Sequence, residues 1–435
     1  MGVAPNQSID VTTRPSAVQT KRSGRQTVDF AGLLRRLSMT TLPQGRSGAS
    51  ADGMRATAAD LARSRAVSLS AADNAISGLL LRWQQSFAQT QEAAVVRTEN
   101  GVRPTIISGT RAAETGNKPA QSAVPASTSA LSLDQYPHPL ADNGRGVHWI
   151  PTLRSSPEVV DRFVGEAKDM RMKWVTFLND GANIGDNDYL VKKLTQAGIE
   201  PVMRIYTTKV GSIDQDVTSM VRHYKDLGVR YFQIFNEPNL KLENGGQDPD
   251  VNRYLDAWIP LAKQVVAGGG LPGLGALSPG GNYDDVKFLD QALQGITARG
   301  EGGVLDRAWL SMHNYMLNHP LDYAKDSNGF LKFKTYDAVV RQRLGRSLPI
   351  IGTEGGLYPG EHQDKTMPAV TEEDQIQRIV GAYKYMGKRE PYNFAYTYWV
   401  LANEEGGGHD PAWSAQALFK PGSTSPLVEK LKGLA

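Results

Sequence analysis

Two glutamates stand where acid–base or nucleophilic chemistry could be carried out. Glu237 follows the run RYFQIFN and Glu354 follows PIIGT, so each comes at the end of a segment typical of a buried strand. Cleavage of a glycosidic bond needs two carboxyl groups, one to protonate the leaving oxygen and one to attack the anomeric carbon. Their environments must differ, because one keeps its proton near neutral pH while the other stays charged. The pair predicts a hydrolytic site if the fold brings the two side chains together.

The segments that would position these residues alternate regularly from about residue 144. Strand-like runs rich in β-branched and aromatic residues alternate with helical patterns, which favours βα units and a parallel sheet. The expected strands are 146–152, 174–180, 200–207, 230–239, 273–281, 308–315, 349–356 and 394–401. Eight units of this length predict an α/β fold, a (β/α)8 barrel over residues 144–435. A doubly wound open sheet is the alternative, but it would carry a glycine-rich turn after its first strand, where the sequence reads PTLRSSPEV.

The active site of such a barrel lies at the C-terminal ends of its strands. Besides the two glutamates, these ends carry amide, hydroxyl and aromatic side chains that suit a sugar. Those that we assign to substrate binding are Trp149, Arg204, Asn236, His313, Tyr315 and Trp399. We predict neither a metal nor another cofactor, because no pair of histidines has metal-ligand spacing. A site made from His148, His313 and a carboxylate is the remaining metal alternative.

The run FQIFNEPN resembles the Asn-Glu-Pro signature of clan A glycoside hydrolases, and IIGTEGG resembles the strand that carries the clan's nucleophile. Within the clan, the sequence pattern is most similar to families 5 and 39, and the resemblance covers residues 144–420. It implies that Glu237 is the acid/base and Glu354 the nucleophile of a retaining enzyme.

Further roles follow from the same resemblance. Asn236 would contact the 2-hydroxyl group of the sugar. The run SMHNY looks like the clan's His-x-Tyr, so His313 would bind the sugar and Tyr315 would contact the nucleophile. The run YTYWV looks like the strand with the clan's floor aromatic, which implies this role for Trp399. Many clan members carry an active-site arginine on strand two, whereas Arg204 lies on the third expected strand, so the sequence departs from the pattern there.

The first third of the chain differs in composition. Only Phe30, Trp83 and Phe87 among the aromatic residues precede residue 136, and residues 1–135 hold 15 Lys and Arg against 9 Asp and Glu. So few large apolar side chains are too little to form a second core. We expect residues 1–100 to be largely irregular, with two short amphipathic helices near 29–37 and 72–96, and residues 101–143 to form a flexible linker. The two helices would pack on the barrel, bind a protein partner or act as a targeting element.

Composition also excludes several classes of function. The chain has no cysteine, which removes disulfides, thiolate nucleophiles and zinc–cysteine sites. A net charge of +3 gives no argument for a nucleic-acid partner, and no apolar run has transmembrane length. A carbohydrate substrate points to work outside the cell or at its surface, yet the first residues lack the basic start and apolar stretch of a secretory signal. The sequence therefore leaves the localisation open.

The leading prediction is a retaining glycosidase that cleaves β-linked poly- or oligosaccharides. A transglycosylase would use the same two glutamates and pass the sugar to another hydroxyl group. A glycan-binding or assembly-associated barrel without appreciable turnover is a further alternative, motivated by the long N-terminal segment. An aldolase or isomerase would need a Schiff-base lysine, a metal cluster or a phosphate loop, and no expected strand end offers one convincingly.

Overall fold

A computed structural model describes residues 129–325, 328–362, 364–403 and 411–434. Eight parallel strands close into a barrel in the order of the chain. They are β1 (Arg145–His148), β2 (Trp174–Asp180), β3 (Glu200–Tyr206), β4 (Tyr231–Ile234), β5 (Leu271–Leu277), β6 (Trp309–Tyr315), β7 (Ile350–Gly356) and β8 (Asn393–Tyr398). The predicted (β/α)8 barrel is confirmed, and the closed sheet rules out the doubly wound alternative. The strand ends differ from the expected ones by a few residues.

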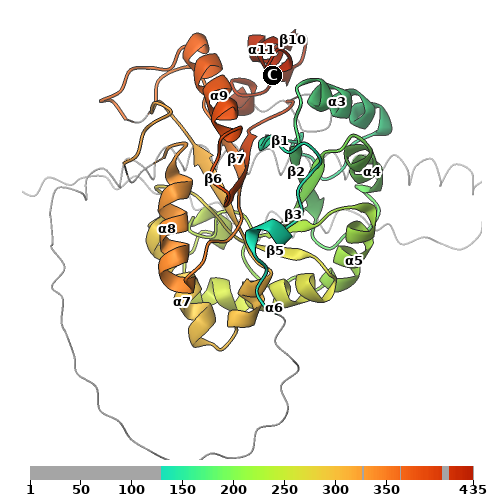
Figure 1. Ribbon diagram of the computed structural model, residues 1–435, viewed down its shortest axis with the longest axis vertical. Helices are drawn as coiled ribbons and strands as arrows, with labels where there is room; N and C mark the ends of the chain where they lie inside the picture. Colours follow the sequence, from blue (N-terminus) through green and yellow to red (C-terminus); the bar gives the residue numbers. More distant parts are fainter. Residues whose placement is uncertain (1–128, 326–327, 363, 404–410, 435) are drawn as a thin grey trace, which may run out of the picture. The chain divides into compact units, whose positions relative to one another are not determined.

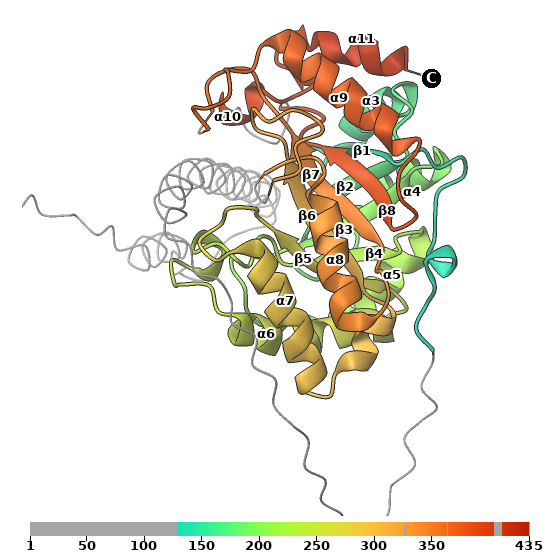
Figure 2. The same cartoon turned by 60° about the vertical axis from the view of Figure 1, so that its left-hand side comes forward.

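A helix follows each strand and covers the outside of the barrel (Figures 1 and 2). The main helices are α3 (Pro157–Asp169), α4 (Asp188–Gln196), α5 (Val217–Leu227), α6 (Val251–Ala267), α7 (Asp285–Ala298), α8 (Lys332–Leu344), α9 (Glu372–Met386) and α11 (Pro426–Lys432). The short helix α10 (Pro411–Ser414) and a two-stranded sheet of β9 (Phe419–Lys420) and β10 (Ser423–Thr424) precede α11. The C-terminal α11 lies beside α9.

Polar side chains at the loop–helix junctions explain where several helices begin. Ser156 accepts a hydrogen bond from a backbone N–H in the first turn of α3, and Asp216, Asp250 and Asp284 do the same at α5, α6 and α7. Thr371 caps α9 in a reciprocal capping box. Each cap satisfies a backbone donor that has no partner within its own helix, which fixes the loops that lead from the strand ends.

The N-terminal end of the barrel is closed by residues 129–143, which include the 3-10 helix η1 (Leu133–Gln135). Tyr136 is 2% exposed, and its hydroxyl group donates to the carbonyl oxygen of Ala308 at 2.8 Å. It packs with a basal cluster at the start of the strands, formed by Trp174, Val202, Tyr231, Leu271, Trp309, Ile351, Phe394 and Ala395. The sequence placed this segment at the end of a flexible linker. The structure differs because Tyr136 and two leucines bury apolar surface over the open end of the barrel.

The remainder of the N-terminal segment, including both expected amphipathic helices, lies outside the described residues. Its division at residue 100 and its protein partner therefore stay predictions. Within the described part of the chain, no helix combines the length and the apolar character needed to cross a bilayer.

Inside the barrel, the side chains change from apolar to polar along each strand. On β6 every second residue faces inward, because side chains alternate along a strand. Trp309 belongs to the basal cluster, and the Ser311 hydroxyl group lies 2.8 Å from that of Thr353 at mid-barrel. His313 and Tyr315 then reach the C-terminal end, where they contact the two glutamates.

The pairing of β6 with β7 contains a bulge that matters for the site. Met312 pairs with Gly352, whereas the next residue, His313, pairs with Glu354. The extra residue in β7 is Thr353, and a bulge of this kind re-aims the side chains that follow it. Consequently Thr353 and Glu354, although adjacent, both make contacts inside the barrel.

Candidate active site

The two glutamates meet at the C-terminal end of the barrel, on either side of one imidazole ring. Nδ1 of His313 lies 2.8 Å from Oε1 of Glu237, and Nε2 of the same ring lies 3.5 Å from Oε1 of Glu354. All three side chains are buried. The fold thus brings β4, β6 and β7 together at the point where the sequence predicted a pair of carboxyl groups.

Glu354 is held through both of its carboxyl oxygens. Arg204 donates from Nη1 to Oε1 at 2.9 Å, and the Tyr315 hydroxyl group donates to Oε2 at 2.9 Å. Burial raises the pKa of Glu354, while His313, the Arg204 charge and the hydrogen bond from Tyr315 act to lower it. A buried carboxylate needs such partners, because an unpaired charge would be costly in this environment.

The two histidines of the site are neutral at pH 7. Burial lowers the pKa of His313 to about 4; Glu354 acts to raise it, and the Arg204 charge lowers it further. Burial likewise lowers the pKa of His148 to about 3, although its hydrogen bond with the Trp149 carbonyl oxygen opposes the shift. A neutral imidazole has one N–H donor and one acceptor nitrogen, so one ring nitrogen of His313 donates a hydrogen bond while the other accepts one.

The backbone around Glu237 adopts an unusual conformation. Phe235 and Glu237 have positive φ values of 63° and 30°, and Ala276 in the neighbouring β5 has 56°. The Glu237 N–H donates to the Ala276 carbonyl oxygen at 3.0 Å. The sequence predicted a strand to residue 239, but β4 ends at Ile234 because the chain turns into this left-handed conformation. Such residues cost of the order of 1–3 kcal/mol each and cluster at functional sites.

The glycines that follow Glu354 give room for two tyrosines. A Cβ atom on Gly355 would lie 2.6 Å from the ring of Tyr396, and one on Gly356 would lie 2.9 Å from the ring of Tyr398. Gly356 also has a φ of 123°, which side chains rarely tolerate. The pattern TEGG therefore has a structural cause, since larger residues here would displace the strand that carries Glu354.

The predicted aromatic ligands Trp399 and Trp149 have different surroundings. Trp399 packs against His148, with ring centroids 4.4 Å apart, in the interior at the C-terminal end. Trp149 donates its indole N–H to the Ser155 hydroxyl group at 3.0 Å and packs against Phe163 of α3. Adjacent residues of an extended segment point to opposite sides, so His148 faces the site and Trp149 faces the surrounding helices. The structure thus separates Trp149 from the other predicted ligands.

Asn236 contacts a carboxyl group that the sequence analysis did not single out. Its Nδ2 donates to Oε1 of Glu243 at 2.7 Å, in the 3-10 helix η2 (Leu242–Asn244). Burial raises the pKa of Glu243 to about 7; the Arg204 charge and the hydrogen bond from Asn236 act to lower it, and Glu237 raises it. The residues predicted for the site lie at strand ends, whereas Glu243 lies in the loop after β4. A glutamate in the loop directly after the Asn-Glu-Pro motif was the signal available.

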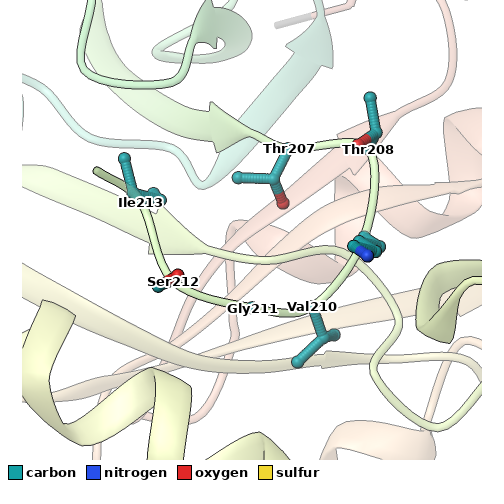
Figure 3. Close-up of a pocket in the computed structure, with 7 residues that line it drawn as sticks. Thr207, Thr208, Val210, Gly211, Ser212 and Ile213 are labelled. Carbon is teal, nitrogen blue, oxygen red and sulfur yellow. The ribbon is translucent and has the colours of Figure 1, made fainter. Parts of the chain in front are cut away.

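An open cavity of about 480 Å³ lies at the loop after β3. It is lined by the loop after β3, residues 207–213, which carries the hydroxyl groups of Thr207, Thr208 and Ser212 (Figure 3). The Val210 N–H donates to the Glu243 carbonyl oxygen at 2.8 Å, which ties this loop to η2. The hydroxyl-rich wall suits a polar ligand.

This arrangement is equipped for proton transfer and for attack by a carboxylate. It offers two buried carboxyl groups, a neutral imidazole between them, and an arginine and a phenol on one of the pair. Among the residues that the structure describes, no group of three or more His, Asp or Glu side chains is placed to hold a metal ion.

No family model matches the sequence, and no curated protein matches it. The chain is similar to solved structures of glycoside hydrolases. One is a family 39 glycoside hydrolase from Bacteroides cellulosilyticus WH2 (TM-score 0.47, 13% identity, 68% of this chain), of which the chain spans only 63%. Another is the GH128 (subgroup II) endo-β-1,3-glucanase of Pseudomonas viridiflava (TM-score 0.47, 16% identity, 68% of this chain and 98% of that one). A third is the endo-β-1,4-mannanase of Thermotoga petrophila (TM-score 0.41, 12% identity, 69% of this chain and 77% of that one).

Proposed function

We propose that the protein is a retaining glycosidase that cleaves β-linked poly- or oligosaccharides, with Glu354 as nucleophile and Glu237 as acid/base. The observation that carries this proposal is the placement of one neutral imidazole between the two carboxyl groups. If Nε2–H of His313 faces the carboxylate of Glu354, then Nδ1 carries no proton and accepts a hydrogen bond from the protonated carboxyl group of Glu237. This tautomer requires a protonated Glu237 and a charged Glu354, which is the state that the first step of the reaction needs.

In the first step, a carboxylate oxygen of Glu354 forms a bond to the anomeric carbon. The bond from that carbon to the leaving oxygen breaks, and the proton of Glu237 passes to this oxygen. Arg204 and Tyr315 keep Glu354 charged and oriented before the attack. The products are a glycosyl ester on Glu354 and a charged Glu237.

In the second step, Glu237 removes a proton from water as the water oxygen bonds to the anomeric carbon. The ester bond to Glu354 breaks, both glutamates return to their starting states, and the anomeric configuration is retained after two inversions. In this proposal Asn236 contacts the 2-hydroxyl group, His313 binds the sugar and Trp399 supports the sugar ring. Trp149 has no part in it, because its ring packs against α3.

The proposal can be tested by chemical rescue. Wild-type protein is assayed on β-linked aryl glycosides, glucans, mannans, xylans and exopolysaccharides, and the active substrate is then offered to Glu354→Ala and Glu237→Ala with and without azide. We expect azide to restore turnover in both variants, with an α-glycosyl azide from Glu354→Ala and a β-glycosyl azide from Glu237→Ala. Azide takes the place of the nucleophile in the first case and of the incoming water in the second.

Glu361→Ala serves as the matched control, because Glu361 is an exposed glutamate in the loop after β7. It should behave as wild type. Undiminished hydrolysis by Glu354→Ala would overturn the proposal, and so would azide products of the opposite configuration. Product analysis with an added acceptor sugar separates hydrolysis from transfer to a sugar hydroxyl group.

A further inference from the structure

Glu243 is a third carboxyl group of the site, and the two-step mechanism does not use it. It is partly exposed and lies in the loop that follows the Asn-Glu-Pro motif. Oε1 accepts the hydrogen bond from Asn236. Oε2 makes no hydrogen bond with any described residue, so it can accept one from a ligand donor.

The contact with Glu243 decides which end of the Asn236 amide is offered to a ligand. With a pKa of about 7, Glu243 is charged in about half of the molecules at neutral pH, and in this form it only accepts hydrogen bonds and so faces the amide nitrogen. Oδ1 of Asn236 is therefore turned elsewhere; it is buried and has no hydrogen-bond partner in the described part of the chain. An acceptor in that state is satisfied by a donor from the ligand.

A cation bound beside Glu243 would favour its charged form. Of the groups that act on the pKa of Glu243, Arg204 is already paired with Glu354, and Glu237 is protonated in the proposed resting state. The histidines add no positive charge at neutral pH, because burial keeps His148 and His313 neutral. Lys209 lines the neighbouring cavity without pairing with Glu243. A ligand ammonium group would thus meet a carboxylate and an amide oxygen side by side.

We propose that Glu243 is a specificity-determining residue of the sugar site, which holds Asn236 as a hydrogen-bond acceptor and selects a sugar unit with a free amino group over one with a hydroxyl group at the same position. This inference rests on the proposed function, because it takes the sugar to lie against Asn236. An ammonium group can donate to both the Asn236 amide oxygen and the Glu243 carboxylate, and its positive charge can pair with that carboxylate. A hydroxyl group supplies one proton and no charge. The cavity at residues 207–213 offers room for the next unit of the glycan.

Binding provides a test that does not depend on turnover. Calorimetry at neutral pH compares the β-1,4-linked tetramer of glucosamine with cellotetraose, since the two have the same backbone and differ in the group at C2. We expect wild-type protein to bind the glucosamine tetramer more tightly. In Glu243→Gln this preference should fall by about tenfold or more, the size expected for a charged hydrogen bond, and Glu243→Asp should restore part of it.

Asp248→Asn is the matched control, because Asp248 lies in the same loop, is exposed and pairs with Lys241. It removes one negative charge near the site and should leave the preference unchanged. Thermal unfolding checks that all variants are folded. Equal affinity for the two tetramers in wild-type protein, no binding of the glucosamine tetramer, or a preference that survives in Glu243→Gln would each overturn the inference. Failure of the proposed function would show instead as absent or Glu354-independent hydrolysis, whatever the binding preference.

Discussion

The two ends of the barrel are built on the same strands but contain opposite kinds of side chain. At the N-terminal end, the basal cluster is almost entirely apolar and aromatic, and Tyr136 packs over it. At the C-terminal end, buried carboxyl groups, an arginine and two histidines occupy the corresponding interior positions. The strand β6 runs from one end to the other, with Trp309 in the apolar basal cluster and His313 and Tyr315 among the polar residues of the site.

The difference separates stability from chemistry within one fold. Apolar burial at the N-terminal end stabilises the barrel by about 25 cal/mol for each Å² removed from water. Burial of ionisable groups at the C-terminal end costs free energy, which their mutual contacts offset only in part. In such barrels the stabilising end and the reactive end can therefore be altered separately.

The largest effect that we expect is from Trp309→Ala in the basal cluster. Trp309 is fully buried, and its indole N–H donates to the Leu271 carbonyl oxygen at 2.9 Å. The cavity and the lost hydrogen bond should lower the free energy of unfolding by about 3–5 kcal/mol, measured by urea denaturation. The kcat of the protein that remains folded should be unchanged. A large loss of kcat with little loss of stability would contradict the separation of the two ends.

His148→Phe should change how stability depends on pH. The folded protein keeps His148 neutral until its pKa of about 3, whereas an unfolded chain takes up the proton near pH 6.5. Wild-type stability is therefore reduced by this residue as pH falls from 6.5 towards 3, because the unfolded state binds more protons. At pH 4 this effect of His148 lowers the free energy of unfolding by roughly 3 kcal/mol. Urea denaturation at several pH values should show a flatter acid limb in the variant; identical limbs would refute the prediction.

Tyr315→Phe tests the reactive end with a smaller change. It removes the hydrogen bond to Oε2 of Glu354 and leaves the ring in place. A hydrogen bond to a charged group contributes about 1.5–3 kcal/mol, so kcat/KM should fall by roughly 10- to 100-fold. That hydrogen bond also lowers the pKa of Glu354, so the acid limb of the pH–rate profile should move to higher pH. An unshifted limb would argue against Glu354 as the nucleophile.

Tyr136→Phe should have the smallest effect. The change removes one hydrogen bond, from the hydroxyl group to the Ala308 carbonyl oxygen, and keeps the buried ring. The free energy of unfolding should fall by about 1 kcal/mol, with no change in kcat/KM. A loss of activity would show that the segment before β1 influences the far end of the barrel.

The sequence predicted the architecture well because the repeating βα pattern is a local signal. All eight strands were expected close to their observed positions, and Glu237, Glu354, His313, Tyr315 and Arg204 come together in space as strand-end residues of a barrel should. Their roles in catalysis stay proposals, since bringing side chains together does not establish what they do.

Other features depend on information that no local pattern contains. Which of two neighbours, His148 or Trp149, faces the interior depends on the register of β1 in the closed sheet. Glu243 belongs to a loop, and its contact with Asn236 depends on how the chain turns after Glu237. The packing of Tyr136 over the basal cluster required knowledge of which surface the barrel leaves uncovered.

The extra residue in β7 shifts the pairing with β6 by one position for every later residue of β7. Deleting Thr353 would restore strict alternation and leave the glutamate paired with His313, but it would remove the hydroxyl group that contacts Ser311. The extra residue thus lets two successive side chains of one strand share the barrel interior, one for packing and one for chemistry.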